Sequence, residues 1–206
     1  MPERSPLLKP GWTYVSTHEM ERMTAEDWRT LDAQRRAFRA ETQAAQVLRQ
    51  FAQLEHEPSF GYPINNYRHC LQSATLAHRD GRDEETVVVC LLHDIGFDLC
   101  PETHGEFAAA LLRPVVHPRH VWMLRHHQVF QDAHVGAHYD ATLDRNGRER
   151  WRGHPHFDWC AEFVARYDQA AMDPDYDNLP LGFFAPMVHR LLSRPARPVA
   201  PVDEAP

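Results

Sequence analysis

Apolar residues recur at intervals of three and four positions along nearly the whole chain. This spacing is typical of helices that bury one face. It predicts helices over residues 24–54, 66–77, 83–94, 102–112, 118–130, 155–167 and 183–192. The sequence shows no internal repeat and no convincing hairpin, so we expect an all-α fold, a helical bundle.

Residues that start or stop helices mark the limits of these segments. Thr24 and Asp27 have the spacing of a capping box at the start of the first helix. Gly96 can stop the helix that ends near residue 94. Residues suited to a helix start precede four other segments: Asn66, Asp83, Pro118 and Pro155. The polar stretch 136–153 predicts a long connection.

The two ends of the chain differ in composition from its middle. We interpret residues 1–22 as a flexible N-terminal arm and the proline-rich residues 194–206 as a disordered tail. Residues 23–193 then form one helical domain. The chain has 206 residues, of which 43% are hydrophobic and 25% are charged, which is ordinary for a soluble globular protein.

Composition also indicates the cellular compartment and the kinds of molecule that the protein can bind. No apolar run approaches the roughly 20 residues of a membrane span, and the N-terminus lacks the layout of a signal peptide. The four cysteines are widely spaced, so we expect reduced thiols and a cytoplasmic protein with no membrane partner. The net charge of −7 argues against a nucleic-acid partner. The sequence leaves the oligomeric state open.

An adjacent pair of titratable residues, His93 and Asp94, ends the apolar run 87–92. Polar side chains in such a place are costly unless something compensates them. A divalent metal can compensate both, because it binds an imidazole nitrogen and a carboxylate oxygen. The alternative is a helix C-terminus at which the His meets the helix dipole and the Asp faces water.

Other potential metal ligands stand on separate predicted helices. They are His69, His104, His126 or His127, and Asp168, and each lies near or within an apolar pattern. Each one alone could be a hydrogen-bonded core histidine or a capping aspartate. Together, in this order, they favour a metal centre.

The order His69, then His93-Asp94, then Asp168 resembles the signature of the HD-domain superfamily, and Leu91–Gly96 resembles its core motif. The resemblance covers roughly residues 60 to 192. It implies an HD-domain helical bundle over residues 23–193.

Two added histidines, His104 and His127, resemble those of the diiron HD oxygenases, namely myo-inositol oxygenase and the phosphonate-oxidising enzymes. The resemblance implies that His69, His93 and Asp168 hold one iron and that His104 and His127 hold the other. Asp94 would then bridge the two Fe ions. Arg125-His126-His127 is similar to the Arg-x-His of inositol oxygenase, which favours His127 over His126. For His126, and for His134, His138, His154 and His156, we expect surface or supporting roles.

The chain departs from these relatives where they hold substrate. Phe97 stands where inositol oxygenase has a lysine, and Gln131 lies where phosphonate oxygenases have one. Because Lys9 is the only lysine, an anionic group must be held by arginine, backbone N–H groups or metal. The candidate substrate-binding residues are Arg125, Arg152, Arg166 and Gln131. Asp94 and Tyr62 are the candidate catalytic residues, with Tyr62 as the candidate to occupy or guard the open metal position.

These observations lead to three hypotheses. The first is an O₂-dependent diiron oxygenase that oxidises a small hydroxylated, anionic metabolite such as a 1-hydroxyalkylphosphonate and cleaves its C–P bond. The second is a phosphohydrolase that uses Mn²⁺, Co²⁺ or Mg²⁺ on a nucleotide or phosphomonoester, since the same ligands can activate water. The third is a metal-dependent sensor without enzymatic activity.

Overall fold

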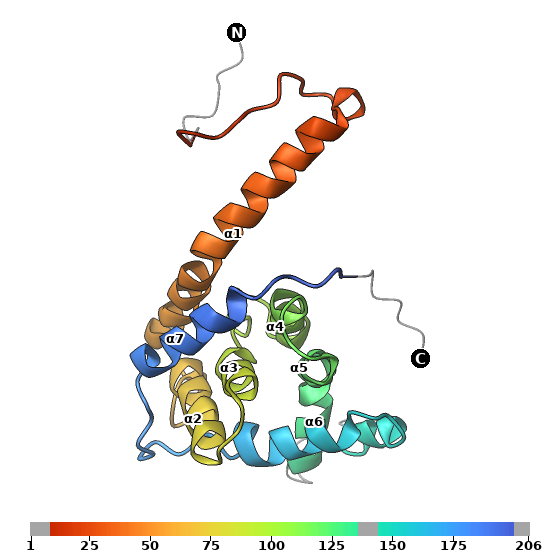
Figure 1. Cartoon of the computed structure of the whole chain (residues 1–206). Coiled ribbons are helices and arrows are strands. Elements are labelled where there is room, and N and C mark those ends of the chain that lie inside the picture. The colour runs from red at the N-terminus through yellow and green to blue at the C-terminus, as the bar shows by residue number, and fades with distance from the viewer. Residues whose placement is uncertain (1–8, 136–143, 200–206) are drawn as a thin grey trace. The chain divides into compact units, whose positions relative to one another are not determined.

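The computed structural model describes residues 9–135 and 144–199, and this part of the chain is helical with no strand. The predicted all-α fold is confirmed for these residues. Figure 1 shows the helices in chain order. Their bounds are α1 Ala25–Gln53, α2 Asn66–Arg79, α3 Glu84–Leu92, α4 His104–Leu112, α5 Pro118–Gln131, α6 Phe157–Phe163 and α7 Leu181–Leu192.

The chain divides into two compact units, residues 1–43 and 44–206, so that α1 belongs to both. In the first unit, the segment before α1 contacts that helix: Thr13 N–H donates to the Gln34 side chain at 2.6 Å. The predicted capping box is confirmed, because Thr24 and Asp27 exchange hydrogen bonds between side chain and backbone N–H. The predicted arm boundary at 22/23 falls inside this unit.

The second unit contains the core. Here α2 packs against α3, α4 against α5, α5 against α6, and α3 against α7. Residues 86–92 of α3 are all buried, which explains why this helix is apolar on every side. Among the largest fully buried side chains are Phe51, Leu91, Leu124, Phe163, Phe184 and Leu191. Burial of aliphatic and aromatic side chains on this scale supplies the main driving force for folding.

Two predicted helix starts need correction. Asn65, not Asn66, caps α2, because its side-chain oxygen accepts from Arg68 N–H. Helix α6 begins at Phe157 rather than Pro155, since His156 is its N-cap. The predicted cap at Asp83 is confirmed by a bond from Thr86 N–H.

The tail is described as far as Val199, and residues 200–206 lie outside the described part. Arg197 N–H donates to the Pro114 carbonyl at 2.9 Å. The Arg194 guanidinium pairs with Glu85. These contacts anchor the beginning of the tail. The four cysteines are free, and none of the described helices is long and apolar enough to cross a membrane.

Candidate metal centre

The six predicted metal ligands lie together in the second unit. They come from five places in the fold: α2, the turn after α3, the start of α4, the middle of α5, and the π-helical turn η5 (Val164–Asp168) after α6. All are buried, with at most 7% of each residue exposed: His69, His93, Asp94, His104, His127 and Asp168. A cluster of this many buried titratable groups requires compensation.

The turn η5 positions the last ligand. Gln169 N–H donates to the Val164 carbonyl at 3.0 Å, so the backbone closes a wider turn than an α-helix does. Such π-turns are rare and often occur at functional sites. Here the wide turn ends at Asp168, whose carboxylate is buried in the cluster.

The donor atoms gather in two groups around the Asp94 carboxylate. In the first group, Nε2 of His69 lies 3.1 Å from Nε2 of His93. The same His69 nitrogen lies 3.5 Å from Asp168 Oδ1 and 3.8 Å from Asp94 Oδ2. Ligands bonded to one metal at about 2.1 Å stand roughly 3 to 4 Å apart, so these separations fit a metal ion.

In the second group, Nε2 of His104 lies 2.9 Å from Nε2 of His127. These nitrogens lie 3.0 and 3.2 Å from Asp94 Oδ1. Asp94 thus turns Oδ2 toward the first group and Oδ1 toward the second. One carboxylate therefore faces both groups with different oxygens, which is the geometry of a bridging ligand.

Backbone carbonyls fix the orientation of all four imidazoles. Each Nδ1 lies 2.7–3.0 Å from a carbonyl oxygen, and the acceptors in chain order of the histidines are Ala171, Cys90, Pro101 and Leu124. A carbonyl can only accept, so Nδ1 carries a proton, and in the neutral, metal-binding form of each ring the Nε2 lone pair points into the cluster. Metal-binding histidines are typically oriented in this way.

This orientation brings Nε2 atoms close together in two pairs, His69 with His93 and His104 with His127. With Nδ1 protonated, two lone pairs face each other at 3.1 Å in one pair and at 2.9 Å in the other. Facing acceptors repel each other unless a cation or a proton lies between them. The arrangement therefore suits metal binding.

The charge state of the carboxylates also suits metal binding. Burial opposes the ionisation of Asp94, but His93, His104 and His127 hold the pKa of its carboxyl well below the usual value. Burial likewise opposes the ionisation of Asp168, yet the surrounding imidazoles, His93 first among them, lower the pKa of its carboxyl. Both side chains are thus carboxylates at neutral pH, the form that binds metals.

Two amide side chains support the carboxylate ligands. Gln131 Nε2 lies 2.9 and 2.8 Å from the two oxygens of Asp168 and donates to them. Asn66 Nδ2 donates to the backbone carbonyl of Asp94 at 2.9 Å. The structure thus places Gln131 at the site, but in contact with the candidate ligand Asp168. No pattern in the sequence indicated the contact of Asn66.

A cavity of about 380 Å³ opens onto the cluster. His69, Asp94, His104 and Asp168 lie at its inner surface, together with Gln131. Apolar and aromatic residues form much of its remaining wall: Phe60, Tyr62, Ile64, Phe97, Val135 and Met172. No lysine or arginine occurs among the described residues that line it.

The turn at the cavity mouth has an unusual backbone. Phe60 has φ of 53° and Gly61 has φ of 100°, and Tyr62 N–H donates to the Ser59 carbonyl to close the turn. A bulky residue with positive φ costs on the order of 1–3 kcal/mol. The turn holds the Phe60 ring 6.1 Å from that of Phe97 and leaves Tyr62 61% exposed at the rim.

The three arginines predicted to bind substrate lie elsewhere. Arg125 pairs with Glu106, Arg152 with Glu149, and Arg166 with both Asp80 and Glu162. None of the three lines the cavity at the cluster. The sequence could not show that these arginines lie away from the cavity, because their ion pairs with acidic residues form only in the folded protein.

The other histidines that the sequence analysis singled out are not among the six clustered residues. His126 stacks on Trp122, which leaves His127 as the residue of this pair that joins the cluster. His134 lines the cavity. His154 and His156 belong to a second cavity, and His138 lies outside the described residues.

Comparison with known proteins identifies no family for the chain. No family model matches it, and no curated protein matches it.

Proposed function

We propose that the chain is an HD-domain protein that acts as a non-haem diiron oxygenase on a small hydroxylated, anionic metabolite such as a 1-hydroxyalkylphosphonate. The observation that carries this proposal is the Asp94 carboxylate, which turns one oxygen to each of two histidine groups. A single-metal site has no need of His104 and His127 at these positions.

The chain's own residues define how substrate would be held. His69, His93 and Asp168 would hold one iron, His104 and His127 the other, and Asp94 both. Iron in such a His and carboxylate set can activate O₂ while positions remain open for substrate. Because the described wall has no lysine or arginine, the substrate's anionic group would face the metal positions rather than a guanidinium.

The apolar residues at the mouth of the cavity would contact the remainder of the substrate. Phe60 and Phe97 suit an alkyl chain. Tyr62 at the rim carries a hydroxyl that could donate to a polar substrate group. The hydroxylated end of the substrate would then lie toward the ligands and its alkyl end toward the turn.

The test is the metal content and oxygen use of protein purified without air. We expect two irons per chain and O₂ consumption with release of phosphate from a 1-hydroxyalkylphosphonate. His104→Ala should retain one metal, whereas the neighbouring His126→Ala should retain both, because His126 lies outside the cluster.

One metal per chain in the wild-type protein would contradict the proposal. Phosphate release from a phosphomonoester with Mn²⁺, Co²⁺ or Mg²⁺ and without O₂ would support the phosphohydrolase instead, since water activation needs the same donors.

A further inference from the structure

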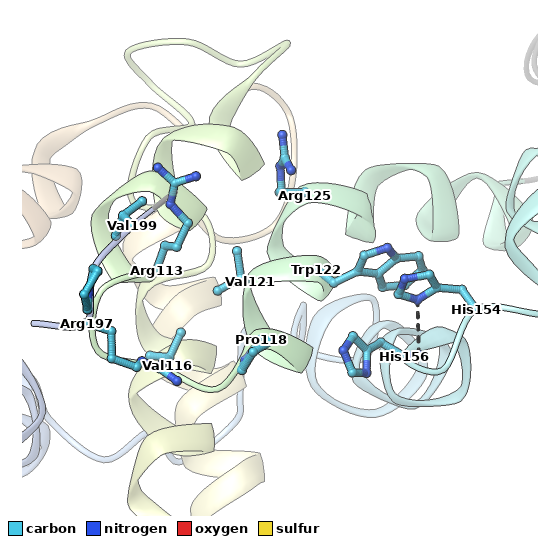
Figure 2. Close-up of a pocket in the computed structure, with 11 residues that line it drawn as sticks. Arg113, Val116, Pro118, Val121, Trp122, Arg125, His154, His156, Arg197 and Val199 are labelled. Atoms are coloured by element: carbon cyan, nitrogen blue, oxygen red, sulfur yellow. Dashed lines mark hydrogen bonds between the residues drawn. The ribbon is translucent and has the colours of Figure 1, made fainter. Parts of the chain in front are cut away.

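A second cavity, of about 480 Å³, lies on another side of α5. His127 on this helix faces the metal cluster, whereas Val121, Trp122 and Arg125 line the second cavity. Figure 2 shows Arg113 and Arg197 toward the left, and the rings of Trp122, His154 and His156 toward the right. Val121 and Pro118 lie between them, and Arg125 lies at the upper edge. The cavity therefore has a charged part and an aromatic part.

The charged part carries more positive than negative charge. Arg113 and Arg197 both line the cavity, and neither forms an ion pair with the residues that the structure describes. Two acids that line neighbouring cavities with these arginines have other partners: Glu106 pairs with Arg125, and Glu85 pairs with Arg194. Two guanidinium groups are thus available to an anion.

Arg113 gives the strongest indication of a ligand. Its Nε is buried and has no hydrogen-bond partner in the described protein. Buried polar atoms are nearly always satisfied, and an unsatisfied one often marks a site for a water or an ion. For a charged donor the cost of leaving it without a partner is larger still.

The aromatic part is built before any ligand arrives. The Trp122 ring is stacked between His126, at 4.1 Å, and His154, at 4.2 Å, with interplanar angles of 15° and 10°. His156 lies beside them, 5.2 Å from His154. Burial lowers the pKa of both His154 and His156, so these rings are neutral at pH 7 and offer uncharged flat surfaces.

We propose that this cavity binds a phosphate monoester of a planar ring, the class that includes aryl phosphates and nucleoside monophosphates. The phosphate would accept from Arg113 and Arg197, since the guanidinium fork matches phosphate oxygens. The ring would pack on the surface of His154 and His156. The size of the cavity falls within the range of small-molecule sites.

The test is a titration of the metal-loaded protein with phenyl phosphate and, separately, with adenosine monophosphate. Calorimetry measures the affinity, and the NMR signal of the Trp122 indole N–H reports binding at this cavity. Inorganic phosphate and phenol serve as half-ligands. We expect either ester to bind at least tenfold more tightly than each half and to shift the Trp122 signal. The tighter ester identifies the subclass, and either result supports the site.

Variants locate the binding. Arg113→Gln should weaken it at least tenfold, and so should Arg197→Gln, whose exposed side chain leaves the fold intact. Arg152→Gln is the matched control, because Arg152 pairs with Glu149 away from the cavity. Binding that is lost in His69→Ala but unchanged in both arginine variants would place the ester at the metals and overturn the proposal.

Discussion

The amide of Gln131 donates to both oxygens of Asp168 and so fixes the carboxylate that faces His69. We expect Gln131→Leu to weaken metal binding about 10- to 100-fold, as loss of such supporting contacts does. Competition with a chromophoric chelator measures this. Gln169→Leu is the control, since its amide also lies at the cavity but donates to the Ala165 carbonyl. Equal affinities in the two variants would contradict the role given to Gln131.

His120 should make stability depend on pH. It is buried, and burial, aided by the charge of Arg119, lowers its pKa to about 4. In the unfolded chain the same residue has a pKa of about 6.5, so between pH 6.5 and 4 the unfolded state binds the extra proton. Stability should therefore be lost as the pH falls through this window, by roughly 3 kcal/mol in total.

Urea unfolding of wild type and His120→Asn between pH 7 and 4.5 tests this. The variant should lose less stability over the window than the wild type, whatever its stability at pH 7. Parallel curves for the two proteins would show that His120 is not the residue responsible.

Single residues also show what a sequence can and cannot reveal. The clustering of the six candidate ligands could be predicted because titratable residues inside apolar stretches are rare and need a partner. The separate roles of the two Asp94 oxygens could not, since they depend on how the turn after α3 meets α4 and α5. The prediction that arginines bind substrate was wrong because it also depends on tertiary structure. From the sequence, Arg166 could contact the cavity or Asp80, and in the fold it pairs with Asp80.

Close contact between α4 and α5 unites the second donor group. A Cβ built on Gly105 would lie 2.2 Å from the Leu124 carbonyl oxygen, and this oxygen also accepts from Nδ1 of His127. We expect Gly105→Ala to separate the helices, destabilise the protein by about 1–3 kcal/mol and weaken the metal held by His104 and His127.

Gly182→Ala is the matched control, because nothing lies within 4 Å of a Cβ at that position in α7. It should leave stability unchanged or raise it by up to about 1 kcal/mol. Chemical unfolding and metal analysis measure both variants. A Gly105→Ala protein as stable as Gly182→Ala would show that the helices can adjust.

The helices were easier to predict than their ends. The period of apolar residues identified α2 to α7, since it reflects which face each helix buries. It missed the wide turn at η5, because the extra residue in that turn does not alter the apolar pattern around Val164 and Tyr167. It also placed the cap of α2 one residue late, at a position where two asparagines are adjacent.

Across the second unit, the candidate metal centre joins segments that are far apart in the sequence. Its donors extend from His69 in α2 to Asp168 in η5. Ligands that bind only the folded state stabilise it, by about 2.7 kcal/mol at a concentration 100 times the Kd. We therefore expect chelation to lower the melting temperature of the wild type.

Scanning calorimetry with and without chelator measures this effect. An Asp94→Asn variant, which loses the shared carboxylate, should melt at nearly the same temperature in both conditions. An unchanged melting temperature in the wild type, after metal analysis confirms removal, would show that the donors do not depend on the metal for their stability.

The sequence predicted the helical class of the whole molecule but not its second cavity. That cavity is formed by residues from 113–125, 154–156 and 197–199, and no spacing along the chain connects these segments. The cavity also includes residues 197–199 of the tail. The proline content of the tail had predicted disorder there.

The shared carboxylate of Asp94 has a further consequence for the proposed pair of metals. An ion in one group draws electron density from Asp94 and so leaves the other oxygen a weaker donor. The two positions would therefore communicate through three atoms, Oδ1, Cγ and Oδ2, without any movement of the backbone. A change of oxidation state at one position would be sensed at the other at once, and the second ion would bind less tightly than the first.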